Sequence, residues 1–352
     1  MPIQIFSILK STDKQIITSV KEILAGDLKK IAIIPHENPD GDAIGSAIGL
    51  ADVLINYGHQ AQIISPNDYP DFLKWFSSKA EIVVFWNDKK KAKQIIANAD
   101  ILICVDFNEP KRAEKLEKKI NEFTGIKILI DHHPYPTEFC DFTISETRYS
   151  STAELIYDLL KSIQLEGFIT QSAAEALYTG ILTDTGSFSH NTSNPNTFKV
   201  VSELMKFDID TEKIQSNVYH NFSSDRMKLL GYCLNKKMKV FPELRTALIS
   251  ISKSELEEYN FKPGDTEGFV NYPLSINNIV FSALFIEKED LVKASFRSKG
   301  NFPSNHFSKN HFNGGGHLNA AGGESYQNLE ETIEKFTQLL PEYRHQLLET
   351  II

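Results

Sequence analysis

Cysteine is scarce in this chain: among its 352 residues, only Cys104, Cys140 and Cys233 carry a thiol. Their number is odd, and their spacing is not that of a metal-binding cysteine motif. We therefore expect no disulfide framework. This cysteine usage is typical of the reducing cytoplasm.

Long apolar runs are missing as well. No segment approaches the stretch of about 18 apolar residues that a membrane-spanning helix needs. Residues 1–10 are partly apolar, but they lack the basic start, long apolar centre and small-residue cleavage site of a secretion signal. We expect a cytoplasmic protein with no membrane partner.

Positive charge is in short supply, because 37 lysines and arginines face 46 aspartates and glutamates, a net charge of −9. Proteins that bind long nucleic acid through many phosphates usually present a basic face. We therefore expect no long nucleic acid as a partner. An anionic substrate would have to be short and bound locally, with help from cations.

The first informative stretch is residues 31–49. An apolar run stops at Pro35 and is followed by His36, Asp40 and Asp42, and then by small residues with a helical period. This pattern predicts a buried strand, a polar loop and a helix. Gly41 should let the backbone turn sharply between the aspartates, so that they face two different ions. The alternative is a polar loop whose aspartates only cap the next helix.

Two more apolar runs end in the same kind of residue. Residues 101–105 run into Asp106, and residues 126–130 run into the triplet that begins at Asp131. Further strands are expected at 61–65 and 81–85, with helices at 11–25, 43–57, 89–99 and 110–123 between the strands. Such alternation predicts an α/β fold, a parallel sheet with helices on both faces. The carboxyl ends of its strands share one edge, where these side chains should converge: His36, Asp40, Asp42, Asp106, Asp131, His132 and His133.

A further aspartate comes later in the chain. Ser151 to Glu154 has the pattern of a capping box ahead of a helix at 155–163. The next helix begins near Gln171 and runs into Asp184, whose negative charge is unfavourable at a helix C-terminus. A local cation would offset this charge. The alternative is that Asp184 merely begins a turn.

The remaining residues change in character. Residues 195–235 look helical, and we interpret them as a connector between a domain at 1–194 and one at 236–352. The second domain alternates apolar and polar residues around a hairpin turn at 287–290, which predicts a smaller, mixed α+β unit. A closing helix at 328–351 should bend at Pro341.

The first domain offers two histidines and four aspartates as metal ligands. Six ligands are too many for one open site and suit two ions that share a bridging carboxylate. Pairs of ions about 3.5–4 Å apart are used to hydrolyse phosphate esters, and imidazole favours manganese, iron, cobalt or zinc over calcium. Each group also has a purely structural interpretation: His36 as a loop histidine, Asp106 as a helix cap and Asp131 as a turn residue.

The second domain carries a glycine run, Gly314-Gly315-Gly316. Its backbone N–H groups suit the binding of an anion. His317 and the guanidinium of Arg297 could also reach a phosphate. A glycine run alone is more commonly a flexible turn.

Together these motifs resemble those of the DHH-family phosphoesterases. The matching segments are His36 to Asp42, Asp106, the triplet Asp131-His132-His133, and residues 180–188. Residues 314–323 look like the signature of the DHH-associated C-terminal domain, with Asn313 where a further glycine is often found. The set spans nearly the whole chain and is most similar to the nanoRNase/pAp phosphatase (NrnA-like) branch.

The resemblance implies a role for each residue. One manganese would be held by His36, Asp40 and Asp106, and the second by Asp42, Asp106, His132 and Asp184, with Asp106 bridging; Co²⁺ and Mg²⁺ are alternatives. Asp131 would orient its neighbours, and His133 would contact the scissile phosphate and assist proton transfer. The far end of the substrate would be bound, across an interdomain cleft, by Arg297, Gly314, Gly315, Gly316, His317 and Asn319.

The implied activity is removal of mononucleotides from very short RNAs and of phosphate from 3′-phosphoadenosine 5′-phosphate. One alternative is cleavage of linear or cyclic signalling dinucleotides. Another, from a different class, is a metal-binding regulatory protein without turnover. A pyrophosphatase is disfavoured because its second domain usually carries lysine and arginine signatures that are not seen here, and a processive exonuclease would want a basic channel. Homodimerisation is left open.

Overall fold

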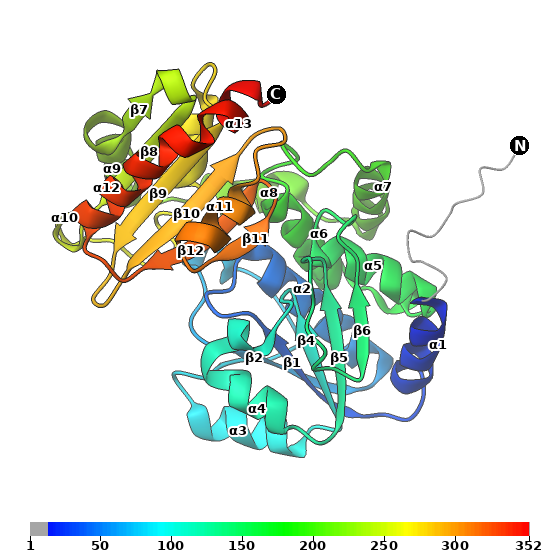
Figure 1. Cartoon of the computed structure of the whole chain (residues 1–352). Coiled ribbons are helices and arrows are strands. Elements are labelled where there is room, and N and C mark those ends of the chain that lie inside the picture. The colour runs from blue at the N-terminus through cyan, green and yellow to red at the C-terminus, as the bar shows by residue number, and fades with distance from the viewer. Residues whose placement is uncertain (1–12, 352) are drawn as a thin grey trace, which may run out of the picture. The chain divides into compact units, whose positions relative to one another are not determined.

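The computed structural model describes residues 13–351, and its contacts divide the chain into two compact units, Met1–Asn221 and Phe222–Ile352. In Figure 1 the first unit runs from blue to green and the second from yellow-green to red. The stretch predicted as a connector, residues 195–235, begins in the first unit and ends in the second. The domain limits at 194 and 235 stay a prediction. Within residues 13–351, no helix is long and apolar enough to cross a membrane.

The first unit contains a parallel six-stranded sheet in the order β3-β2-β1-β4-β5-β6. Its strands are β1 (Lys30–Pro35), β2 (Gln60–Ser65), β3 (Ile82–Val84), β4 (Ile101–Val105), β5 (Ile126–Asp131) and β6 (Phe142–Ser145). The predicted parallel sheet is confirmed. Strand β6 was not predicted, because its four residues carry only a short apolar signal.

Helices cover both faces of this sheet, as predicted. Ile31 and Ile33 of β1 pack into one core with α1, α2, α5 and α6, while Ala32 and Ile34 pack into a second core with α3 and α4. This alternation follows from the two-residue repeat of a strand. The helices are α1 (Asp13–Leu24), α2 (Gly41–Tyr57), α3 (Lys89–Asn98), α4 (Glu117–Glu122), α5 (Thr152–Ser162), α6 (Gln171–Asp184), α7 (Pro195–Leu204) and α8 (Thr211–Tyr219). Short 3-10 turns span Asp71–Leu73, Pro110–Leu116, Glu166–Phe168 and Met205–Phe207.

Helices α2 and α6 pack unusually closely. A Cβ atom on Gly45 would lie 2.4 Å from the carbonyl oxygen of Ala176, and one on Gly41 would lie 2.4 Å from Oγ1 of Thr183. The role predicted for Gly41 was therefore wrong. Gly41 is the first residue of α2 and has no positive φ, so it serves close packing rather than a sharp turn.

One predicted helix differs in length. Residues 110–123 begin as the 3-10 segment Pro110–Leu116, and only Glu117–Glu122 is α-helical. Glu114 interrupts the helical path with φ of 41°. The charged pattern of this stretch resembles a helix, but the interruption at Glu114 confines the α-helix to its last turns.

The second unit contains a mixed six-stranded sheet in the order β11-β12-β10-β9-β8-β7, in which β8 and β9 are parallel and the other pairs antiparallel. The predicted hairpin around 287–290 joins β9 and β10. Its strands are β7 (Lys239–Phe241), β8 (Thr246–Ile251), β9 (Phe281–Glu287), β10 (Val292–Ser298), β11 (Gly315–His317) and β12 (Ala320–Ser325). One face packs on a phenylalanine-rich core that includes Phe281, Phe296 and Phe336.

The helices of this unit lie on both faces of its sheet. They are α9 (Ser224–Tyr232), α10 (Lys253–Glu258), α11 (Ser304–His311), α12 (Leu329–Leu339) and α13 (Arg344–Glu349), with a π-helical turn at Cys233–Lys237 and 3-10 turns at Pro242–Leu244, Phe269–Ser275 and Leu340–Tyr343. The predicted closing helix is therefore two helices, which a 3-10 turn containing Pro341 separates. A proline lacks the N–H that an uninterrupted helix needs.

Candidate metal centre

The candidate site lies at the carboxyl ends of three neighbouring strands of the first unit. His36 directly follows β1, Asp106 directly follows β4, and Asp131 ends β5. Strands β1 and β4 are adjacent at the point where the strand order reverses, which is where open parallel sheets place their ligands. All three side chains are buried.

Helices supply the other side chains. Asp42 comes from the first turn of α2 and Asp184 from the last residue of α6. The close packing of these two helices brings both carboxylates to the sheet edge. The resulting groups, each with ligand atoms within 4.8 Å of one another, are His36–Asp40–Asp106, Asp42–His132–Asp184 and Asp106–Asp131–His133. The convergence predicted from strand topology is thus observed, while the roles of the residues stay predictions.

The histidine rings are oriented as metal ligands would be. Nδ1 of His36 lies 2.7 Å from the carbonyl oxygen of Glu37, and Nδ1 of His132 lies 3.3 Å from that of Tyr149. Since a carbonyl oxygen only accepts, both Nδ1 atoms carry the proton and both Nε2 atoms carry the lone pair. Such hydrogen bonds from the second ring nitrogen are usual for metal-bound histidines.

The Nε2 atoms face carboxylates at distances too long for hydrogen bonds. From Nε2 of His36, Asp106 lies at 3.6 Å and Asp40 at 3.9 Å. From Nε2 of His132, Asp184 lies at 3.6 Å and Asp42 at 3.9 Å. Burial lowers the pKa of His36 and His132, which keeps the rings neutral. A neutral lone-pair donor among carboxylates is a ligand set rather than an ion pair.

The carboxylates need a positive partner. Burial, followed by the charge of Asp40, raises the pKa of Asp42 to about 7, and burial raises the pKa of Asp131 to about 6. Burial and the charges of Asp42 and Asp40 raise the pKa of Asp106 well above its ordinary value. Divalent cations would relieve this repulsion. The donor set therefore fits two such ions.

Asp106 lies at the centre of the site. Its Oδ2 is 3.6 Å from Nε2 of His36, and its Oδ1 is 3.7 Å from Nε2 of His132, so its two oxygens face the two ligand groups. Its backbone has φ of 67°, the left-handed region that few residues other than glycine adopt. Strain of this kind is often held at functional sites.

Asp40 fits both interpretations of its loop, as a helix cap and as a candidate metal ligand. Its Oδ1 accepts hydrogen bonds of 3.0 Å from the backbone N–H groups of Asp42 and Ala43, so it is the N-cap of α2. It also belongs to the ligand group of His36 and Asp106. Capping orients this carboxylate beside the histidine.

His133 is the remaining histidine of the triplet. Its Nδ1 lies 2.8 Å from Oδ1 of Asp131, and burial together with the charges of His132 and Arg112 lowers the pKa of His133 well below the ordinary value. Arg112 was not predicted as part of the site. Its position six residues after Asp106 is the only sequence signal that could have drawn attention to it.

Thr152 was also missed. Its hydroxyl donates to Oδ1 of Asp106 at 2.7 Å, and its N–H donates to Oδ2 of Asp42 at 2.7 Å. The sequence pattern from Ser151 suggested only a capping box. Ser151 is indeed the N-cap of α5, but the carboxylate of Glu154 accepts from N and Oγ of Ser150 rather than closing the box.

The predicted substrate residues of the second unit share one row of its sheet. Arg297 of β10 and His317 of β11 both pair with Ala320 of the intervening strand β12. Residues that pair directly have side chains on the same face, and two strand spacings separate the backbones by about 10 Å. The side chain of Asn319 donates to Oγ of Ser298 and to the carbonyl oxygen of Gly300 at 2.9 and 3.0 Å.

The glycine run is part of a hairpin rather than an irregular loop. A Cβ atom on Gly314 would lie 1.9 Å from the carbonyl oxygen of Gly322, and Gly316 has φ of 136°, whereas Gly315 has open space beside it. Asn313, which precedes the run, has φ of 49°. Asparagine tolerates this region of backbone conformation better than most residues.

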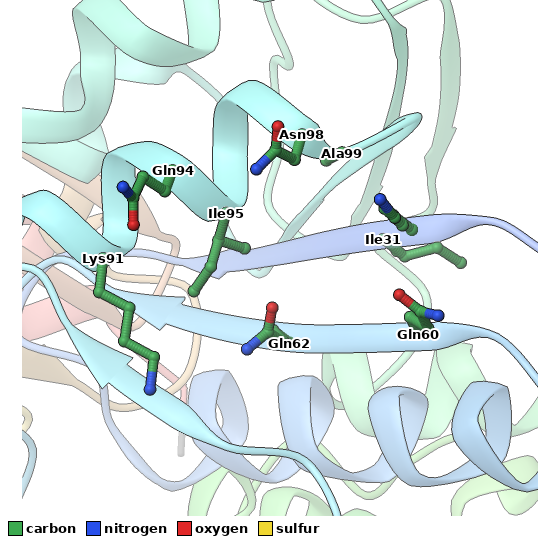
Figure 2. A pocket seen from close by; sticks show the side chains of 9 residues that line it. Ile31, Gln60, Gln62, Lys91, Gln94, Ile95, Asn98 and Ala99 are labelled. Atoms are coloured by element: carbon green, nitrogen blue, oxygen red, sulfur yellow. The ribbon is translucent and has the colours of Figure 1, made fainter.

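A polar hollow elsewhere in the first unit is not this site. It has a volume of about 300 Å³ and lies where side chains of α3, including Lys91 and Gln94, extend over β1 and β2 (Figure 2). Lys30 and Gln60, which line it, are the first residues of their strands. The hollow is therefore at the amino ends of the strands, opposite the metal centre.

Known proteins resemble this chain in both units. The profile described as DHH family, N-terminal domain, matches residues 30–181, and that of the DHHA1 domain matches residues 247–344. A probable bifunctional oligoribonuclease and PAP phosphatase NrnA of Streptococcus mutans is 30% identical over 331 residues, covering 92% of this chain and 98% of that protein. The cyclic-di-AMP phosphodiesterase GdpP of Bacillus subtilis is 29% identical over 337 residues, covering 92% of this chain and 49% of that protein. The crystal structure of an exopolyphosphatase-related protein from Bacteroides fragilis has a TM-score of 0.90 and 40% identity, covering 96% of this chain and 98% of that one.

Proposed function

This chain belongs to the DHH family of phosphoesterases, and from that premise we propose that it is a manganese-dependent phosphohydrolase of short oligoribonucleotides and of 3′-phosphoadenosine 5′-phosphate. The observation that carries the proposal is the pair of ligand groups on either side of Asp106. The NrnA relative, matched over 98% of its length, bears the name of both activities.

In this proposal each residue has a defined task. His36, Asp40 and Asp106 would hold one ion, and Asp42, Asp106, His132 and Asp184 the other. When bound, two such ions supply an acidified water and offset the charge of the phosphoryl oxygens. The backbone carbonyls that accept from Nδ1 of His36 and His132 would orient these ligands.

His133 would handle the proton of the reaction. If Nδ1 donates to Asp131, the lone pair of the neutral ring is at Nε2, which suits contact with the scissile phosphate or its leaving oxygen. Asp131 would hold the ring in this orientation. The guanidinium of Arg112, whose charge reaches both His36 and His133, would attract the phosphate.

The second unit would bind a part of the substrate away from the scissile phosphate. Arg297 and His317 lie in one row of its sheet and suit an anionic group. With a net charge of −9, the chain offers no general attraction for long nucleic acid. Recognition of only a few nucleotides agrees with this charge.

A second candidate function is cleavage of signalling dinucleotides, which the similarity to GdpP favours. A panel assay with Mn²⁺ separates the two: 3′-phosphoadenosine 5′-phosphate, RNA of two to five nucleotides, a 24-nucleotide RNA, linear and cyclic dinucleotides, and pyrophosphate. We expect the highest efficiency on the bisphosphate and the shortest RNAs. Equal rates on the shortest and the 24-nucleotide RNA, or a preference for cyclic dinucleotides, would contradict the primary proposal.

A further inference from the structure

The start of α5 contacts ligands from three other elements at once. The backbone carbonyl of Tyr149 is 3.3 Å from Nδ1 of His132. The hydroxyl of Thr152 donates to Oδ1 of Asp106 at 2.7 Å, and the N–H of Thr152 donates to Oδ2 of Asp42 at 2.7 Å. One short segment therefore orients a ligand from the end of β5, one from the end of β4 and one from α2.

The hydroxyl of Thr152 is the side-chain part of this arrangement. Thr152 is fully buried, and its bond to a carboxylate is of the short, charge-assisted kind. Asp106 has a strained backbone and faces both ligand groups, so the direction of its two oxygens decides how well each ion fits. Partners that hold metal ligands typically change metal affinity or activity 10- to 100-fold when they are removed.

The buried carboxylate of Glu154 holds this segment in place. Glu154 accepts hydrogen bonds from N and Oγ of Ser150 at 2.9 and 2.6 Å. It also accepts from Nδ2 of Asn196 at 2.8 Å and from Oγ1 of Thr197 at 2.9 Å. The start of α5 is thus held in place by residues outside the proposed ligand set.

We propose that Thr152 is a positioning residue that orients the bridging carboxylate of Asp106 and thereby sets the affinity of the site for divalent cations. The inference rests on the proposed metal dependence and adds a residue to it. Thr152 itself touches neither ion nor substrate. Its effect should therefore appear in metal binding before it appears in chemistry.

The test measures Mn²⁺ binding to the metal-free full chain by calorimetry, alongside thermal unfolding. Thr152→Val removes the hydroxyl and keeps the shape, and we expect it to weaken Mn²⁺ binding about 10- to 100-fold. Thr152→Ser keeps the hydroxyl and should stay within about threefold of wild type. Thr332→Val, in the second unit, is the matched control, because it also removes the hydroxyl of a fully buried threonine, which donates to Oγ of Ser325 at 2.9 Å, without touching a proposed ligand or the segment that orients it. It should lower the melting temperature while leaving Mn²⁺ affinity near that of wild type.

Activity gives an independent reading. For Thr152→Val, raising the Mn²⁺ concentration should restore much of the lost rate, because the deficit lies in occupancy of the site. Unchanged Mn²⁺ affinity in Thr152→Val, an equal loss of Mn²⁺ affinity in Thr152→Ser, or an equal loss in Thr332→Val would each overturn the role of Thr152. A wild-type chain that binds no Mn²⁺ would overturn the proposed metal dependence itself, and the role of Thr152 with it.

A different observation concerns Tyr135, two residues after His133. Its side chain is 84% exposed, and its backbone has φ of 60°. An aromatic residue in the left-handed region is rare, and such strain gathers at ligand-binding positions. The Cα atoms of residues two apart in sequence are at most about 7 Å from each other, so the backbone of Tyr135 lies close to that of His133.

The loop that carries Tyr135 is tied down on both sides. Nδ2 of Asn108 donates to the carbonyl oxygen of Pro134 at 2.7 Å, and the N–H of Thr137 donates to the carbonyl oxygen of Asn108 at 2.8 Å. A second proline, Pro136, follows the tyrosine directly. A tyrosine side chain has few rotatable bonds, and on a loop whose backbone is held in this way it loses little entropy when it binds a flat ligand.

We infer that Tyr135 stacks on the nucleobase joined to the scissile phosphate, an inference that rests on the proposed nucleotide substrates. Stacking suits any base and therefore a degradative enzyme without sequence preference. Tyr135→Ala should raise the KM for an RNA dinucleotide about 5- to 50-fold, and Tyr135→Phe should restore it. For a substrate analogue that lacks this base, Tyr135→Ala should raise the KM much less.

Equal effects of Tyr135→Ala on the two substrates, or a loss in Tyr135→Phe as large as in Tyr135→Ala, would refute stacking. So would an unchanged KM in Tyr135→Ala. If the wild-type enzyme hydrolyses no dinucleotide at all, the proposed substrate class is wrong, and the stacking role falls with it.

Discussion

Nδ1 of His133 lies 2.8 Å from Oδ1 of Asp131, so the catalytic histidine of the proposal is held by its own triplet. His133→Gln should lower kcat about 100- to 10,000-fold, because it removes the proton-transfer group. Mn²⁺ affinity should change little, since His133 is outside the proposed ligand set. Asp131→Asn, whose amide oxygen can still accept a hydrogen bond from the ring, should lower kcat less than Asp131→Ala. Near-wild-type kcat in His133→Gln would contradict the assignment.

The metal centre predicts a specific response to Asp106→Ala. Turnover should be abolished while the fold persists, because the residue that faces both ligand groups is gone. A chelator should inactivate the wild-type enzyme, and manganese or cobalt should restore it better than calcium. Mn²⁺ should raise the melting temperature of the wild type but not of Asp106→Ala, since only the native site binds the ion. Substantial activity in the variant would remove the two-ion proposal.

Arg297 tests the division of labour between the two units. Arg297→Ala should remove a guanidinium–phosphate contact that contributes about 1.5–3 kcal/mol, a roughly tenfold to hundredfold loss in kcat/KM. Arg297→Lys keeps the charge but loses the two-pronged geometry, so its loss should be intermediate. On bis-p-nitrophenyl phosphate, which lacks a distal phosphate, the loss should be much smaller. Equal losses on both substrates would show that Arg297 is structural or part of the chemical centre.

Glu255 predicts how acid affects the stability of the second unit. Partial burial raises its pKa, but hydrogen bonds from Lys237, the Ser252 N–H and Tyr232 outweigh it and lower the pKa to about 2. A depressed carboxyl pKa stabilises the fold above the unfolded value of about 4.5, and this stabilisation is lost as the pH falls toward 2. In urea unfolding between about pH 5 and pH 3, wild type should lose stability more steeply than Glu255→Gln. Parallel pH profiles would contradict this linkage.

Two glycines should respond to alanine in opposite directions. Gly45→Ala should destabilise the first unit by about 1–3 kcal/mol, because its Cβ would lie 2.4 Å from the carbonyl oxygen of Ala176. Gly231→Ala is the matched control, since this glycine of α9 has nothing within 4 Å of its would-be Cβ. It should stabilise the chain by about 0.5–1 kcal/mol through helix propensity. Similar effects of the two changes on denaturant unfolding would contradict the close packing of α2 and α6.

The sheet and the ligands could be predicted because one topological rule connects them. Once residues 31–35, 101–105 and 126–130 are read as parallel strands, their carboxyl ends must share an edge, whatever the loops do. Asp106 and Asp131 needed no further information to be placed together. Asp184 required only that its helix end at the same edge.

The contacts that orient those ligands could not be predicted in the same way. Thr152 contacts Asp106 only because α5 begins at the edge of the sheet. The local sequence around Thr152 indicates no more than the start of a helix. Gly41 is a second example. The preference of glycine for turns can be applied to a local sequence, but the close approach of Thr183 to Gly41 depends on how α2 and α6 pack in the tertiary structure. The charge of Arg112 influences His36 and His133 through a position set by the fold, which its spacing from Asp106 does not reveal.

The spread of the ligands along the chain also bears on synthesis. The group of His36, Asp40 and Asp106 is complete once β4 has been made, whereas the group of Asp42 and His132 waits for Asp184 at the end of α6. The residues of the first proposed ion site are therefore synthesised well before those of the second are complete. Under the proposed two-ion mechanism, hydrolysis would therefore begin only after α6 has docked.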